Sequence, residues 1–151
     1  MPETLATSSK HFTITRVFDA PRDVIWRAWT DPAEATHWLH PRGFTTPIES
    51  VRLDNRVGGT YAYTMVGPDG SEYSTGGEYL EITEPERLVM TWGDPDRPDE
   101  PQPVLEIELR DRGESTEMVF TVRGVDGAPG DHNVYDGWVS AFDVLVERLA
   151  G

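Results

Sequence analysis

Apolar residues recur along this chain with two different periods, and the changes between them separate strands from helices. Residues 11–19 alternate apolar and polar side chains imperfectly, which predicts a first strand. Helical spacing follows at once, at Val24, Ile25, Ala28 and Trp29. Pro21 stands where the first turn of a helix tolerates proline, because the missing N–H has no partner there in any case. A helix is therefore expected directly after the first strand.

A second start signal, Thr30-Asp31-Pro32, comes immediately after this helix. It combines a side chain that can cap a helix with a proline at the first turn, so it predicts another short helix. Two short helices inserted after the first strand of a chain rich in strands is an uncommon layout. This layout narrows the set of possible folds before any functional residue is considered.

Six further runs have the composition and alternation of strands. They cover residues 48–53, 60–66, 71–83, 88–92, 104–110 and 116–123. Gly67-Pro68-Asp69-Gly70 is typical of a hairpin turn, and Gly76-Gly77 predicts a bulge or a sharp bend. Several of these runs place apolar side chains on one face only. We therefore expect an antiparallel sheet with one buried face.

The last twenty residues return to helical spacing. Their apolar positions form one continuous stripe, Val134, Trp138, Ala141, Phe142, Leu145 and Leu149. Asp131 or Asn133 can cap the start of this helix. Gly137 lies inside it, where glycine costs about 1 kcal/mol relative to alanine. Close packing against the sheet is the interpretation we favour, and room for a ligand is the alternative.

These elements predict an α+β fold in which a curved antiparallel sheet of about seven strands encloses a long C-terminal helix. The two short helices follow the first strand. A single domain is expected over residues 11–151, after a disordered N-terminus at residues 1–10. Large rings that meet across a curved sheet seldom fill space completely, so we expect a cavity under the terminal helix.

Charge and composition exclude several classes of function. Thirteen basic and 27 acidic residues give a net charge of −14, which repels nucleic acid and anionic membrane surfaces. The chain has no cysteine, and therefore no disulfide, thiolate nucleophile or zinc-thiolate site. It has no apolar run of about 18 residues and no signal-peptide pattern. We expect a cytoplasmic protein that does not insert into membranes.

Candidate metal and calcium ligands do not form a known pattern. His37 and His40 stand three residues apart, but a third ligand is not evident and Pro41 ends the segment. Surface histidines are the interpretation we favour. The acidic residues within 94–100 indicate a solvated loop, because prolines interrupt the ligand spacing of a calcium loop. No metal is expected.

Catalytic patterns are also missing from the sequence. It contains no nucleophile elbow, phosphate loop or dinucleotide fingerprint, so we assign no catalytic residue and no cofactor. Glu78, Glu81 or Glu106 could supply acid–base chemistry inside a cavity. Strand alternation, however, places most of the acidic side chains outward.

A set of large inward-facing side chains forms the candidate ligand site. It comprises Trp29, Trp38, Tyr61, Tyr63, Met65, Trp92, Phe120, Trp138 and Phe142. Tyrosine hydroxyls and indole N–H groups are natural donors to a polar ligand atom. A closed aromatic core is the alternative for this set. Trp29 and Trp38 either close the mouth of the cavity or anchor the two short helices.

Several short motifs occur in a fixed order over residues 12–149. They are APRDVIWRAWTDP at 20–32, Trp38, Gly58-Gly59, Pro68-Asp69-Gly70, Gly77 with Glu81-Ile82, PERLV at 85–89 with Thr91-Trp92, and Gly137-Trp138. As an ordered set they resemble the activator of heat-shock protein 90 ATPase homologue-like family, within the START/polyketide-cyclase superfamily. Departures from the family pattern, at 53–57 and at Glu84-Pro85, lie in turns. The resemblance implies a helix-grip fold around a ligand-accessible cavity.

The leading hypothesis is therefore a monomeric or homodimeric binder of a small lipophilic molecule, such as a lipid, polyketide or flavonoid. We favour a binder without enzymatic activity, although the sequence leaves catalysis open. One alternative, which the resemblance implies, is a polyketide aromatase or cyclase. Another is a chaperone-interacting module, but the co-chaperones that name the family carry a second domain. These 151 residues leave no room for one, so chaperone binding is not expected.

Overall fold

The computed structural model describes residues 10–94 and 102–150. Residues 1–9, expected to be disordered, and most of the acidic loop fall outside these ranges. The strands are β1 (His11–Phe18), β2 (Arg52–Leu53), β3 (Thr60–Val66), β4 (Glu72–Thr83), β5 (Arg87–Thr91), β6 (Val104–Asp111) and β7 (Thr116–Arg123). The α-helices are α2 (Arg22–Thr30), α3 (Pro32–Ala35) and α4 (Val134–Ala150), and η1 (Ile48–Ser50) is a 3₁₀-helix.

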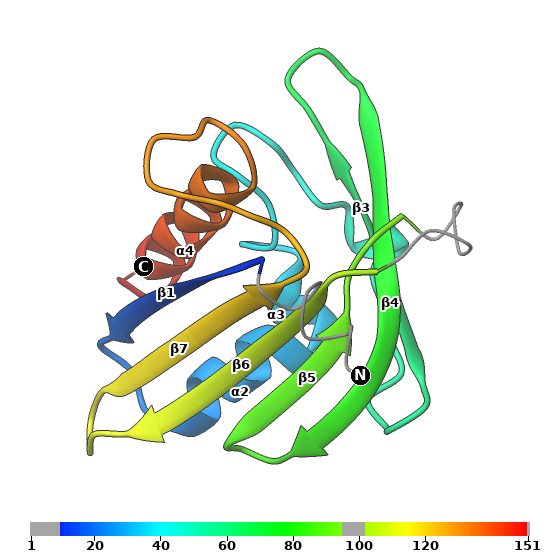
Figure 1. Ribbon diagram of the computed structural model, residues 1–151. Helices are drawn as coiled ribbons and strands as arrows, with labels where there is room; N and C mark the ends of the chain where they lie inside the picture. The colour runs from blue at the N-terminus through cyan, green and yellow to red at the C-terminus, as the bar shows by residue number, and fades with distance from the viewer. Residues whose placement is uncertain (1–9, 95–101, 151) are drawn as a thin grey trace.

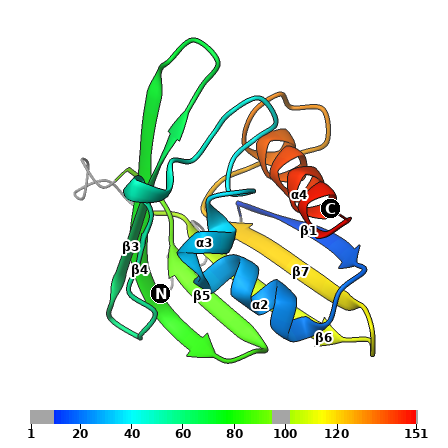
Figure 2. The ribbon, with the colours of Figure 1, turned by 180° about the vertical axis from the view of Figure 1, so that it is seen from behind.

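The seven strands form one antiparallel sheet in the order β1-β7-β6-β5-β4-β3-β2. Figure 1 shows β4 curving along its length, so that β3 and β4 stand upright against the rest of the sheet. The helices α2, α3 and α4 all lie on one face, with α4 beside β1 and β7 (Figure 2). The expected α+β helix-grip fold is confirmed.

The two start signals in the sequence begin two helices, with a shift of one residue at the first. Pro21 is the capping residue of α2, and its carbonyl oxygen accepts from the Val24 N–H at 3.0 Å. The Asp31 side chain caps α3 by accepting from the Ala33 N–H at 2.9 Å, with Pro32 in the first turn. Helix α3 is only four residues long, and residues 36–40 after it form turns.

Gly76 and Gly77 are required by close backbone approach. A Cβ atom at Gly76 would lie 2.5 Å from the carbonyl oxygen of Tyr61, and one at Gly77 would lie 2.0 Å from that of Thr91. The irregular pairing of β4 with β5 falls later, between Tyr79 and Glu81. Of the two alternatives predicted at the glycine pair, the bulge therefore lies a few residues later, and the sharp bend remains for Gly76 and Gly77.

The strand predicted at residues 48–53 is wrong over its first half. Residues 48–50 form η1, and only Arg52 and Leu53 pair with β3. The Ser50 hydroxyl donates to the Pro47 carbonyl at 2.6 Å, which closes the turn. Ile48, one of the apolar residues of this run, is 51% exposed. Alternation over so few residues does not distinguish a strand from a turn that happens to carry apolar side chains.

The core lies between the sheet and the helices. Across β1, β7 and β6 the register aligns Ile14, Phe120 and Ile107, and all three are buried. From α4 the buried residues are Trp138, Ala141, Phe142 and Leu145, as the stripe predicted. The terminal helix therefore packs along the sheet through one face, and this packing fixes its rotation about its own axis.

Asp131 is the residue that caps α4. Its carboxylate accepts from the backbone N–H groups of Tyr135 and Asp136, both at 3.2 Å. Removal from water acts to raise the pKa of this carboxyl, but hydrogen bonds from four backbone N–H groups outweigh it and lower the pKa. The cap fixes the start of the helix beside the cavity described next.

Candidate functional site

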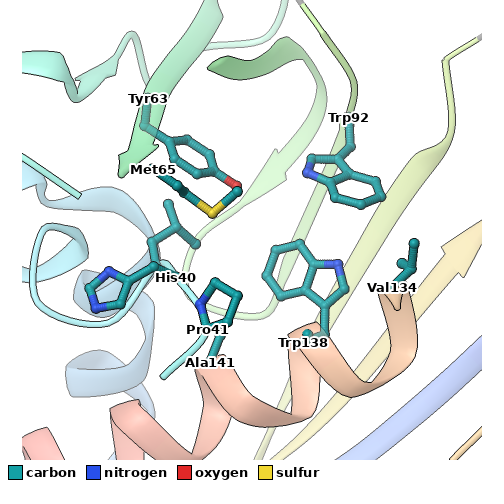
Figure 3. A pocket seen from close by; sticks show the side chains of 10 residues that line it. His40, Pro41, Tyr63, Met65, Trp92, Val134, Trp138 and Ala141 are labelled. Atoms are coloured by element: carbon teal, nitrogen blue, oxygen red, sulfur yellow. The ribbon is translucent and has the colours of Figure 1, made fainter. Parts of the chain in front are cut away.

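A cavity of about 120 Å³ lies between the first half of α4 and the upright part of the sheet. Figure 3 shows side chains from four parts of the chain converging on it. The α4 wall consists of Val134, Gly137, Trp138 and Ala141. The opposite walls consist of Tyr63 and Met65 from β3, Trp92 just after β5, and the turn residues Leu39, His40 and Pro41. The lining is almost entirely apolar, as is typical of small-molecule sites.

Gly137 leaves open space on the α4 wall. A Cβ atom built at this position meets nothing within 4 Å, and the Gly137 N–H still donates to the Asn133 carbonyl at 2.8 Å as in a regular helix. The close approach of sheet to helix that we favoured from the sequence is therefore wrong. The missing side chain leaves volume at the cavity instead.

Tyr63 and Trp92, together with His40, carry the polar groups of the lining. Figure 3 shows the Tyr63 hydroxyl and the Trp92 indole nitrogen near one another on the cavity wall. The Trp92 Nε1 atom is buried, and no acceptor meets it in the geometry of a hydrogen bond. Burial raises the pKa of the Tyr63 hydroxyl far above its ordinary value, although weak hydrogen bonding by the nearby Trp92 and Thr75 side chains acts to lower it. Tyr63 is consequently a neutral phenol.

A second space of about 20 Å³ lies deeper, toward α2. It shares Leu39, Tyr63 and Trp138 with the main cavity. Trp29 lines it, and the Nε1 atom of Trp29 is buried without a hydrogen-bond partner. A volume of this size holds about one water molecule. The two spaces therefore adjoin the same three side chains, with one unpaired indole N–H beside each.

The structure divides the nine predicted site residues into three groups. Tyr63, Met65, Trp92 and Trp138 line the main cavity. Trp29 and Tyr61 line the smaller space, and the Tyr61 hydroxyl donates to the Thr91 carbonyl at 2.5 Å. Trp38, Phe120 and Phe142 line neither space and are fully buried in the core.

Trp29 and Trp38 pack the short helices and the turn after them into the core, instead of closing the mouth of the cavity. Trp29 stacks on Phe120 with ring centroids 6.0 Å apart and meets Trp38 edge-on at 4.8 Å. Phe120 in turn meets Phe142 edge-on at 5.0 Å. These contacts join α2, the turn after α3, β7 and α4. For this part of the set, the alternative of a closed aromatic core is the one that the contacts support.

Sequence reasoning missed several lining residues. Val134 and Ala141 were assigned to the apolar stripe and not to the site, although they share a helix face with Trp138. That shared face was a usable signal. Leu39 and Pro41 lie in a turn without periodicity, so no pattern in the sequence connects them with α4.

His40 is buried, contrary to the surface position expected for it, and only 9% exposed. Its Nδ1 atom lies 2.9 Å from the Thr46 hydroxyl, which itself donates to the Leu39 carbonyl at 2.9 Å. Thr46 can therefore only accept from His40, and Nδ1 carries the proton. Burial, with a smaller contribution from His37, lowers the pKa of His40. Over residues 10–94 and 102–150, no three acidic or histidine side chains are grouped as metal ligands.

The acidic residues considered for catalysis lie outside the cavity lining. Arg87 Nε donates to Glu81 at 3.1 Å, and Arg123 Nε donates to Glu106 at 2.6 Å. Glu78 is exposed. These positions agree with the outward placement that strand alternation predicted. Separately, no helix in the described part of the chain combines the length and apolar character needed to cross a membrane.

A curved antiparallel sheet closed over a long C-terminal helix, with a cavity between them, defines the START-type helix-grip class. The model of one family within this class, the Activator of Hsp90 ATPase homolog 1-like proteins, matches residues 19–150. The chain belongs to this family. No functionally curated protein matches it.

Solved structures agree with this assignment. Protein CV1439 from Chromobacterium violaceum is 27% identical, with a TM-score of 0.80 over 93% of this chain and 96% of its own. Protein Ms6760 from Mycobacterium smegmatis is 26% identical, with a TM-score of 0.77 over 96% and 92%. PFC0360w, an HSP90 activator from Plasmodium falciparum, shares the fold at 24% identity, with a TM-score of 0.59 over 79% and 76%.

Proposed function

We propose that the protein binds a small lipophilic or aromatic molecule, such as a lipid, polyketide or flavonoid, between the sheet and α4. The observation that carries this proposal is the apolar cavity of about 120 Å³ beside Gly137. An engineered apolar cavity of about 150 Å³ in another protein stays dry and binds benzene. A space of comparable size favours a ring or a short acyl segment over water.

The source of binding energy would be the removal of apolar ligand surface from water. Each Å² of apolar surface buried contributes about 25 cal/mol. The rings of Tyr63, Trp92 and Trp138 offer flat faces on which an aromatic ligand can stack. Because the walls come from rigid elements, little ordering cost would accompany binding.

The polyketide cyclase alternative has no specific support in the lining. Cyclisation chemistry would need an acid–base pair beside the ligand. The ten lining residues include no carboxylate, and the Nδ1 atom of His40 is engaged with Thr46. Ligand binding without catalysis is thus the simpler proposal for this cavity.

A role in chaperone activation is a second candidate, supported by the family name and by the fold shared with the Plasmodium activator. One surface feature is consistent with such a role. Phe44 and Tyr73 lie together beside the β3–β4 hairpin with ring centroids 5.9 Å apart, and Tyr73 is 48% exposed. Titrating the middle domain of the chaperone against a Tyr73→Ser variant would test this contact.

Nuclear magnetic resonance of the indole N–H groups tests ligand binding directly. Each of the five tryptophans contributes one such signal, so a ligand in the cavity should shift those of Trp92 and Trp138. A panel of lipids, flavonoids and polyketides is titrated into the wild type and into Gly137→Leu, which fills the cavity. Shifts that persist in the filled variant, or no shifts with any compound, would refute the proposal.

A further inference from the structure

We propose, building on the function proposed above, that the cavity selects uncharged, ring-sized ligands that carry a carbonyl oxygen. This oxygen would lie beside both the Trp92 indole N–H and the Tyr63 hydroxyl. Ketones, quinones and lactones have this chemistry. Carboxylates of the same size would be rejected.

The first observation is the unpaired donor of Trp92. Its Nε1 atom is buried, and although it acts weakly on the nearby Tyr63 hydroxyl, no acceptor meets it in the geometry of a hydrogen bond. A buried donor without a partner destabilises the protein, because it has lost its hydrogen bond to water. Trp92 does not turn freely to find one, because its backbone N–H is fixed to the Pro103 carbonyl at 2.9 Å and its ring packs on Trp138 with centroids 5.6 Å apart. An acceptor on the ligand would relieve this destabilisation.

The second observation is a neutral donor near the first. Tyr63 projects from β3, where its ring stacks on Tyr61 with centroids 6.3 Å apart. Because burial keeps its hydroxyl protonated, the group can donate to a ligand oxygen. The Tyr63 hydroxyl and the Trp92 indole nitrogen lie near one another on the cavity wall in Figure 3, so one ligand oxygen placed beside both could accept from both.

The third observation is the absence of positive charge in the lining. None of the ten lining residues is lysine or arginine, and His40 is held neutral by burial. The net charge of −14 adds a field that opposes anions. A carboxylate that left water here would find no counter-charge, which is very costly. A carbonyl oxygen needs only the two neutral donors.

Three probes of similar size separate these effects: acetophenone, ethylbenzene and benzoate. Their dissociation constants are measured at pH 7 by indole N–H titration with the wild type and with Trp92→Phe and Tyr63→Phe. Each variant keeps an aromatic ring and removes a donor. For acetophenone, each should weaken binding about tenfold, which corresponds to one hydrogen bond of about 1.4 kcal/mol. For ethylbenzene, each should change binding by less than about twofold.

Trp138→Phe is the matched control, because it alters an indole in the same cavity that is not the proposed donor. It should affect acetophenone and ethylbenzene equally. Benzoate should bind at least about tenfold more weakly than acetophenone to the wild type. If the Trp92 and Tyr63 variants treat ketone and hydrocarbon alike, or benzoate binds as well as acetophenone, the carbonyl site is refuted while ligand binding stands. If none of the three probes binds while a compound of the lipid, flavonoid and polyketide panel does, this inference is refuted and ligand binding stands. If neither the probes nor the panel bind, the proposed function fails and this inference with it.

Discussion

The indole Nε1 of Trp38 donates a hydrogen bond of 2.9 Å to the backbone carbonyl of Ala28 in the buried core. That carbonyl has no partner within its own helix, because the residue four positions later is Pro32, which has no N–H. Trp38 therefore supplies the hydrogen-bond donor that is missing because Pro32, in the second helix start signal, has no N–H. The same bond ties the turn after α3 back onto α2 and so positions the cavity residues that follow it.

Trp38→Phe should lower the free energy of unfolding by about 1–3 kcal/mol, because it leaves the Ala28 carbonyl buried and unpaired. Trp29→Phe is the matched control, since the Trp29 N–H has no acceptor to lose. Urea denaturation monitored by circular dichroism measures both. Equal losses in the two variants would show that ring volume, and not the hydrogen bond, determines the effect.

Gly137→Ala should raise the free energy of unfolding by up to about 1 kcal/mol, because alanine is the better helix former and its Cβ enters open space. Gly137→Leu should fold equally well and lose ligand binding, because its longer side chain enters the cavity. Thermal unfolding and the indole N–H titration test the two parts. A destabilised Gly137→Ala protein would mean that the helix approaches the sheet more closely than the structure indicates.

Stability should decrease as the pH falls below about 6.5, the ordinary pKa of histidine. Burial lowers the pKa of His40, so the unfolded chain takes up a proton there before the folded protein does. The stabilisation that comes from keeping His40 neutral is thus complete above the ordinary pKa of histidine. It is lost as the pH falls through the lowered pKa of His40 in the folded protein. His40→Asn retains a donor for Thr46 without a titrating ring. Its free energy of unfolding should depend less on pH between about 6.5 and 5 than that of the wild type, and an unchanged slope would contradict the assignment.

At alkaline pH the sign of the effect reverses for Tyr63. Its pKa in the folded protein is raised by burial, so above about pH 10 the unfolded chain loses a proton that the folded protein retains. The free energy of unfolding should then fall by at most about 1.4 kcal/mol per pH unit for this residue. Tyr63→Phe should show a shallower fall than the wild type between about pH 9 and 11. Tyr61 and Tyr79, whose pKa values burial also raises, contribute in the same direction.

Patterns in the sequence predicted the structure correctly where they extended over a long element. The stripe on residues 134–149 predicted α4 and its buried face, because 3.6-residue spacing sustained over about four turns is seldom produced by anything but a helix. The run at 48–53 was too short for such certainty, and half of it folds as a 3₁₀-helix. Glycine was ambiguous for a related reason. At Gly77 the backbone of Thr91 excludes a side chain, whereas at Gly137 nothing does. Only the tertiary structure distinguishes these two glycines.

The sequence by itself determined the order of elements, the family resemblance and the group of aromatic residues on the inner face. These follow from short-range spacing, capping side chains and turn residues, which act within a few positions along the chain. Only the tertiary structure decided which aromatics close the core and which line a cavity. Trp38 and Trp92 carry the same indole, but one finds an acceptor ten residues away in the chain and the other finds none. That difference depends on where distant segments meet, and no local pattern records it.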